Sequence, residues 1–209
     1  MKMNSKIMYP LLAMLLHLFI CPVLAIAAGK AHINDDNFVD EQIGTTQSNG
    51  ITCYQSAKYL VVAREVQGEV GTDFLIKYKS NPREKLECSY VHGKDDFEIK
   101  NEWAEYFAGL MHDLLILDST TGPGPSGLII WDLLKRKKVY EGSWSGAEEA
   151  NDDRLVFWTE TGEATAGNCP ELEKWKAQGL DGAIETKVIL NLTNFQITET
   201  QQTRCSPRQ

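Results

Sequence analysis

The chain has 209 residues, a formal net charge of −8 and 43% hydrophobic residues. This length suits one domain, and the acidic balance excludes the basic footprint that nucleic-acid binding needs. Beyond the first 27 residues no apolar run reaches the ~20 residues of a membrane helix, so we expect no stable membrane insertion of the processed protein.

Residues 1–27 have the organisation of a secretory signal peptide. Lys2 and Lys6 precede an apolar run over 11–20, and Ala25 and Ala27 are the small residues that signal peptidase requires. We predict cleavage after Ala27 and a periplasmic or secreted protein, because the apolar run is short for an uncleaved anchor. Cleavage would leave 19 basic and 29 acidic side chains, a formal charge of −10.

The exported part keeps an even number of cysteines, which predicts two disulfides. They are Cys53, Cys88, Cys169 and Cys205. Three pairings are possible, and short-range closure favours Cys53–Cys88 with Cys169–Cys205. A zinc site is the alternative, but the sequence has no CxxC pair, so we expect no metal and no cofactor.

The first half of the exported chain alternates polar turns with short strands. Residues 28–50 are rich in Asn, Asp, Gly and Thr, which predicts a flexible polar leader. Strands are predicted at 58–66, 73–79 and 85–90, and the alternation in the last of these places Cys88 on an inward face. Residues 97–99 fit a strand, whereas the apolar spacing over 103–111 fits a short helix or an irregular turn.

Residues 112–144 form the most regular stretch. Apolar runs at 114–117 and 128–131 and a third strand from Val139 are separated by a Gly- and Pro-rich loop and a basic turn, which predicts an antiparallel meander. An acidic loop at 146–153, a strand at 154–160, a short helix from Pro170 and strands at 185–192 and 195–198 follow. No repeat of propeller-blade length is evident.

These elements predict a mainly β protein. We expect a single antiparallel β domain over 51–209, built as a sandwich, a barrel or a propeller-like meander. One or two short helices and two disulfides complete the predicted fold.

Three motifs fall short of catalytic signatures. The segment 142–146 has Trp144 where a nucleophilic serine must stand, the segment 118–120 lacks the glycine of an aspartic protease, and the loop 122–127 lacks the lysine of a phosphate loop. We therefore predict no catalytic residue. A hydrolase built on distant carboxylates is an alternative, with Glu102, Asp113, Asp118 and Glu160 as candidates.

The loop between the two most apolar strands is the predicted binding element. Two prolines and three glycines over 119–127 make it stiff, which lowers the ordering cost of binding; a simple strand connection is the alternative. Trp144, flanked by glycine and serine, is the tryptophan that we expect to be exposed. The predicted binding residues are Asp118, Ser119, Thr120, Thr121, Ser126 and Trp144.

Export, two disulfides and the lack of a catalytic set predict a soluble binding or inhibitor-type protein of the cell envelope. An inhibitor or immunity protein against a wall-degrading enzyme or toxin is an example. The acidic balance favours a basic protein partner. A structural or assembly component of the envelope is the alternative. The basic turn 135–138 fits either an anionic docking surface or a solvated turn that protects a sheet edge.

Overall fold

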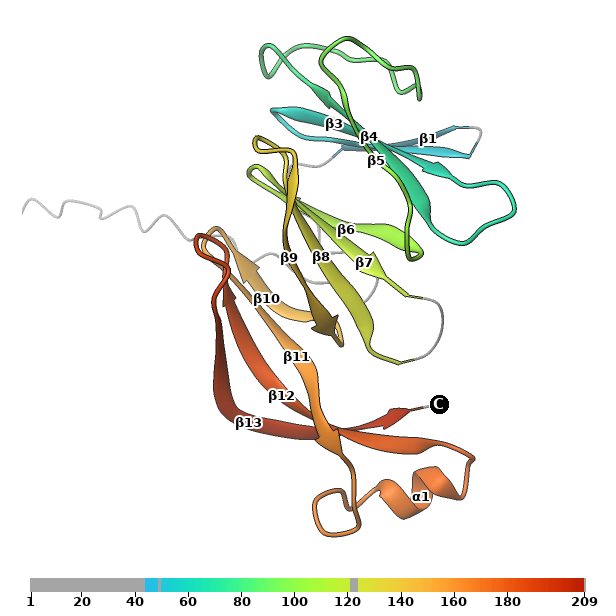
Figure 1. Ribbon diagram of the computed structural model, residues 1–209, viewed down its shortest axis with the longest axis vertical. Coiled ribbons are helices and arrows are strands. Elements are labelled where there is room, and N and C mark those ends of the chain that lie inside the picture. The colour runs from blue at the N-terminus through green and yellow to red at the C-terminus, as the bar shows by residue number, and fades with distance from the viewer. Residues whose placement is uncertain (1–43, 49, 121–123, 209) are drawn as a thin grey trace, which may run out of the picture.

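The computed structural model describes residues 44–48, 50–120 and 124–208 (Figure 1). The predicted signal peptide and most of the predicted leader lie outside the described residues. Gly44–Ser48, at the end of that leader, forms the first strand.

The described part of the chain contains one short helix and a series of strands. The helix is α1 (Leu172–Lys176). The strands are β1 (Gly44–Ser48), β2 (Ile51–Gln55), β3 (Tyr59–Glu65), β4 (Thr72–Tyr78), β5 (Phe97–Ile99), β6 (Glu105–Met111), β7 (Leu114–Ser119), β8 (Ser126–Asp132), β9 (Lys137–Trp144), β10 (Ala147–Asn151), β11 (Arg154–Glu163), β12 (Asp181–Asn191) and β13 (Ile197–Arg208).

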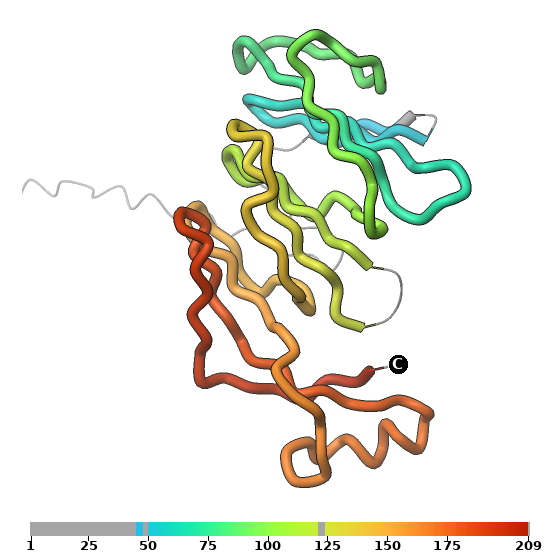
Figure 2. Tube along the Cα trace, in the orientation of Figure 1, coloured from blue at the N-terminus to red at the C-terminus, as the bar shows by residue number. Residues whose placement is uncertain are grey.

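Strands that follow one another in the chain pair into three antiparallel sheets. The N-terminal sheet holds β1–β5, the middle sheet β6–β9 and the C-terminal sheet β10–β13, each in chain order. Four consecutive up-and-down strands are also the layout of a propeller blade. The sheets are stacked along the long axis of the molecule (Figures 1 and 2). This arrangement confirms the mainly β prediction and corresponds to its propeller-like alternative.

The middle sheet is buried on both faces. Leu115, Leu117 and Ile129 belong to the core shared with the N-terminal sheet. Ile116 and Ile130, which alternate with them, belong to the core shared with the C-terminal sheet. In a strand that is buried on both faces, apolar residues do not alternate with polar, solvent-exposed ones. This explains the continuous apolar runs in this part of the sequence.

The three sheets repeat one hydrogen bond at the same end of the stack. In each unit of four strands (β2–β5, β6–β9 and β10–β13), the residue just before the second strand accepts a hydrogen bond at its carbonyl oxygen. The donor is the backbone N–H of the residue just after the third strand. These bonds are Lys79 to Lys58 at 2.9 Å, Leu133 to Asp113 at 2.8 Å and Leu192 to Asp153 at 2.8 Å. Ion pairs between Lys58 and Asp113 and between His112 and Asp152 connect the turns of adjacent sheets. The fold therefore contains a structural repeat that the sequence did not reveal.

The predicted helix or turn over 103–111 is wrong for most of its length, because Glu105–Met111 is strand β6. The register between β6 and β7 shifts between Phe107 and Gly109, which marks a β-bulge. The bulge puts Phe107 and Leu110 into one core and Ala108 and Met111 into the other. Apolar residues therefore recur three apart on each face, and this spacing imitates a helix.

Two other predicted elements differ from the structure. Residues 85–90 form no strand; Leu86, Cys88 and Tyr90 instead pack over the outer face of the N-terminal sheet, against Leu60 and Leu75 among others. The predicted acidic loop at 146–153 contains strand β10, which begins the C-terminal sheet.

Both predicted disulfides are present. Cys53–Cys88 attaches the covering segment to β2, and Cys169–Cys205 attaches the segment before α1 to β13. Two such bonds fit a non-reducing compartment outside the cytosol. None of the described residues belongs to a helix long and apolar enough to cross a membrane.

The outer face of the C-terminal sheet carries a charged cluster around Glu185, whose side chain is fully buried. Its carboxylate accepts hydrogen bonds from Arg204 and Arg208, both at 2.6 Å. Burial favours the neutral acid, but the two guanidinium groups outweigh it and hold the pKa of Glu185 below its usual value. The carboxylate therefore stabilises the fold in its ionised form.

This cluster predicts acid sensitivity. Because the pKa of Glu185 is lower in the folded state, its contribution is present at neutral pH and is lost as the pH falls below the ordinary value of glutamate. Glu185→Gln is expected to lower the free energy of unfolding by about 1–3 kcal/mol at pH 7, with a smaller difference at pH 3. Urea unfolding at both pH values checks this, and an equal difference at both would contradict it.

Candidate functional site

An exposed tryptophan marks the turn between β5 and β6. The Trp103 side chain is 70% exposed, yet its backbone is fixed: its N–H donates to Glu105 Oε2 at 2.8 Å, and its carbonyl accepts the Ser119 hydroxyl. The next residue, Ala104, has a positive φ of 59°. A non-glycine residue in this region is uncommon and persists only where neighbouring contacts hold it. Trp103 is thus presented to solvent by a rigid turn.

Asn101 connects this turn to the N-terminal sheet. Its amide nitrogen donates to the carbonyl of Val70 at 2.7 Å, its backbone N–H donates to Asp73 Oδ1 at 3.0 Å, and its side-chain oxygen accepts the N–H of Glu105 at 3.0 Å. Glu105 itself is only 4% exposed. The contacts of Asn101 and Glu105 leave the turn little freedom.

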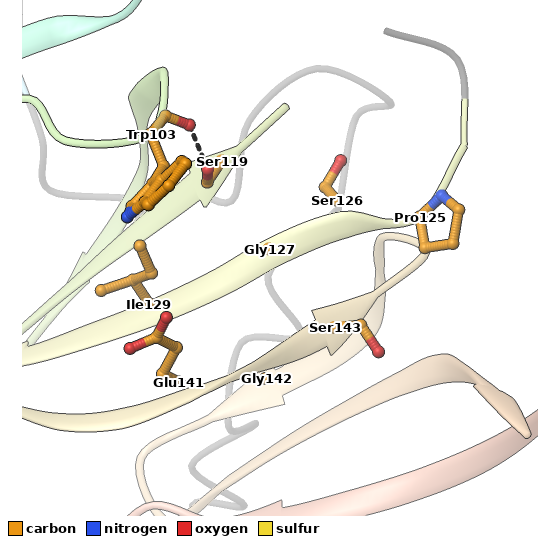
Figure 3. A pocket seen from close by; sticks show the side chains of 9 residues that line it. All are labelled: Trp103, Ser119, Pro125, Ser126, Gly127, Ile129, Glu141, Gly142 and Ser143. Carbon is orange, nitrogen blue, oxygen red and sulfur yellow. Dashed lines mark hydrogen bonds between the residues drawn. The ribbon is translucent and has the colours of Figure 1, made fainter. Parts of the chain in front are cut away.

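A groove of about 410 Å³ lies beside Trp103, at the end of the middle sheet. In Figure 3 the Trp103 ring, the Ile129 side chain and the Glu141 carboxylate follow one another along one side of it. The loop ends add Ser119 and Pro125, and the lining is completed by Ser126, Gly127, Gly142 and Ser143. Apolar and polar surfaces therefore meet in one open hollow.

Gly127 lines the groove next to Ser119. A Cβ atom at this position would lie 3.1 Å from the Cβ of Ser119 on the neighbouring strand. A side chain at this position would therefore crowd Ser119, so glycine suits this part of β8.

The polar groups of the groove differ in how firmly they are held. The Ser143 hydroxyl lies 3.0 Å from that of Thr159 in β11 and is directed toward the C-terminal sheet. Glu141 has a 58% exposed side chain and pairs with Lys138 at 2.5 Å. Ion pairs this exposed contribute about 1 kcal/mol or less, so Glu141 is accessible to a ligand.

The structure divides the predicted binding residues between two faces. Ser119 lines the groove; Ser126 also borders it, but its hydroxyl donates a hydrogen bond to Asp118 on the other face of the sheet. Thr120 donates its N–H to the carbonyl of Ala104 at 3.3 Å, which holds the loop against the tryptophan turn. Thr121 lies outside the described residues. The ends of the predicted binding loop therefore lie next to Trp103, a residue that the sequence gave no reason to choose.

Asp118 and Trp144 lie on the opposite face of the sheet. Trp144, expected to be exposed, is only 5% exposed, packs in the core between the middle and C-terminal sheets and donates its indole N–H to Asp118 at 2.6 Å. That expectation was wrong because Gly142 and Ser143 continue strand β9 up to Trp144, whose ring packs against Phe157 of the C-terminal sheet. Burial raises the pKa of Asp118, against the hydrogen bonds from Trp144 and Ser126.

The candidate carboxylates do not form a catalytic pair in the groove. Asp113 accepts hydrogen bonds from Lys58 and Tyr59 at the far end of β7, and Glu160 pairs with Arg208 at 3.2 Å. Asp118 faces away from Glu141. Within the described ranges, no group of three or more His, Cys, Asp or Glu side chains is placed to hold a metal ion.

The basic turn is largely occupied by contacts within the protein. Lys135 pairs with Asp132 at 2.6 Å and Lys138 with Glu141. Arg136 donates to the carbonyl of Asp95 at 2.7 Å and lies over the Tyr78 ring. The turn therefore fits the interpretation as a strand connection better than that of an anionic docking surface.

A second hollow of about 630 Å³ lies at the edge of the N-terminal sheet. Its cation, Arg64, already pairs with Asp73 at 2.8 Å and stacks on the Tyr90 ring. Its lining holds no aromatic side chain. The groove beside Trp103 is the better candidate. Comparisons with known protein families, curated proteins and solved structures found no match for the chain.

Proposed function

We propose that the protein works outside the cytoplasm as a binding protein of the inhibitor type, which captures a protein partner through the groove beside Trp103. The observation that carries this proposal is a 70% exposed tryptophan on a turn fixed by Glu105, Asn101 and Ser119. Tryptophan is among the residues that most often dominate protein interfaces. A side chain already held in place loses little entropy when it binds.

The geometry favours binding over hydrolysis. A glycosidase needs two carboxyl groups that flank the glycosidic bond of its substrate, within about 10 Å of each other. Asp118 and Glu141 instead lie on opposite faces of the middle sheet. Asp113 and Glu160 are held in ion pairs or hydrogen bonds away from the groove, and Glu102 is not among the residues that line it. The groove is also open to solvent, which suits a protruding segment of another protein.

The compartment and the charge narrow the class of partner. The two disulfides support a periplasmic or secreted protein, and the predicted signal peptide supports the same location. The net charge of −8 favours a basic partner, because opposite potentials speed the encounter. Inhibition of a basic enzyme that degrades the cell wall, or neutralisation of a basic toxin, fits these properties.

Site-specific photocrosslinking tests the proposal. The photoreactive residue p-benzoylphenylalanine replaces Trp103 in one variant and Leu134 in a control variant; Leu134 is 67% exposed on the turn after β8, outside the groove. We expect one discrete crosslinked protein from the first variant and none from the second. No crosslink at position 103, or crosslinks to many envelope proteins as in a structural role, would contradict the proposal.

A further inference from the structure

Aromatic rings in this protein recur as platforms for cations. Arg64 lies 3.7 Å from the centroid of the Tyr90 ring, and Arg204 lies 4.5 Å from that of the Trp158 ring. Such contacts stabilise a guanidinium group by about 0.5–2 kcal/mol. No cation of the described chain lies over the ring of Trp103.

A carboxylate accompanies both of these cations. Asp73 accepts a hydrogen bond from Arg64 at 2.8 Å, and Glu185 accepts one from Arg204 at 2.6 Å. In both cases the guanidinium lies over a ring and donates a hydrogen bond to a carboxylate, and arginine favours this combination of partners. The fold thus contains two complete sets of ring, guanidinium and carboxylate.

The groove holds two of these three parts. Trp103 supplies the ring and Glu141 the carboxylate, with the apolar side chain of Ile129 between them (Figure 3). Glu141 now pairs with Lys138, three residues away, in an exposed contact. An arriving guanidinium that also contacts the ring can replace this lysine.

We propose that the groove receives an arginine side chain of the partner protein, with its guanidinium over the Trp103 ring and in an ion pair with Glu141. This inference rests on the proposed function, because it names the group of the partner that the groove binds. Arginine is favoured over lysine, since its planar group stacks and binds a carboxylate with two parallel hydrogen bonds. The net charge of −8 also favours a positively charged ligand.

Titration with tri-arginine amide tests the inference without the natural partner. The disulfide-bonded protein is followed by the NMR signals of its indole N–H groups, and Trp103→Phe assigns the signal of Trp103. We expect a saturable shift of that signal, with the buried Trp144 and Trp158 as internal controls. Tri-lysine amide is expected to bind at least threefold more weakly.

Three charge variants separate a built site from general attraction to an acidic protein. Glu141→Gln is expected to weaken tri-arginine binding at least fivefold. Lys138→Ala, which frees Glu141, is expected to strengthen it about twofold. Glu69→Gln removes the same charge from an exposed turn away from the groove and is expected to leave binding unchanged.

The result that would overturn the inference is equal binding by the wild type, Glu141→Gln and Glu69→Gln, or no shift of the Trp103 signal at all. A shift with neutral chitotriose in place of tri-arginine amide would also overturn it and would assign the groove to sugars. Each of these results leaves the crosslink at position 103 free to succeed, so the failure of the inference and the failure of the proposed function are distinguishable.

Discussion

Gly71→Ala is expected to destabilise the protein by about 2–4 kcal/mol, the sum of backbone strain and overpacking. Gly71 has a φ of +97°, and a Cβ atom there would lie 2.6 Å from the Cα of Ala104 and closer still to the side-chain oxygen of Asn101. This Cα atom belongs to the backbone of the turn that carries Trp103, so it cannot move aside without displacing Trp103. The variant should therefore lose partner affinity as well as stability.

Gly68→Ala is the matched control for this change. Gly68 also has a positive φ, +81°, but no atom lies within 4 Å of the position where its Cβ would be placed. Gly68→Ala is expected to lower the free energy of unfolding by about 1–2 kcal/mol, from backbone strain alone. Denaturant unfolding compares the two variants, and equal losses of stability would show that the close packing of Gly71 against the turn has no energetic role.

Much of the fold could be predicted from local patterns. The apolar runs at 114–117 and 128–131 became β7 and β8 because strands buried on both faces need no polar side. The pairing of Cys53 with Cys88 and of Cys169 with Cys205 followed from short-range closure. The strands depend on residues close in sequence, and each disulfide joins cysteines that are neighbours in the order of the chain, 35 and 36 residues apart.

The repeat of three sheets could not be predicted in the same way. The three turns that carry the repeated hydrogen bond, at Lys58, Asp113 and Asp153, are unequally spaced along the chain. The N-terminal sheet has a long connection between β4 and β5, and part of that connection forms the disulfide-linked cover over its outer face. A search for a fixed period fails because this insertion breaks it.

The candidate site was predicted in part. Strand alternation alone shows that Asp118 and Ser119 point to opposite faces, so the predicted set could have been divided before the structure was known. Trp103 could not be found, because the bulge after Phe107 gave its segment a helical spacing. Which tryptophan is exposed depends on contacts with Glu105 and Ser119 that no local pattern encodes.

Trp103→Ala is expected to weaken binding of the crosslinked partner at least 30-fold, since truncation of a dominant interface residue costs about 2 kcal/mol or more. The free energy of unfolding should change by less than about 0.5 kcal/mol, because the side chain is mostly exposed and the turn is held by its backbone. A large effect on binding with a small effect on stability is typical of a residue that acts in recognition.

The most direct test is the dissociation constant of that partner, measured by isothermal titration calorimetry for the wild type, Trp103→Ala and Leu134→Ala. Leu134→Ala also truncates an exposed apolar side chain, but on the turn after β8 and away from the groove. A binding site at Trp103 predicts a loss of at least 30-fold for Trp103→Ala and a change of less than twofold for Leu134→Ala. Equal dissociation constants for all three proteins would contradict it.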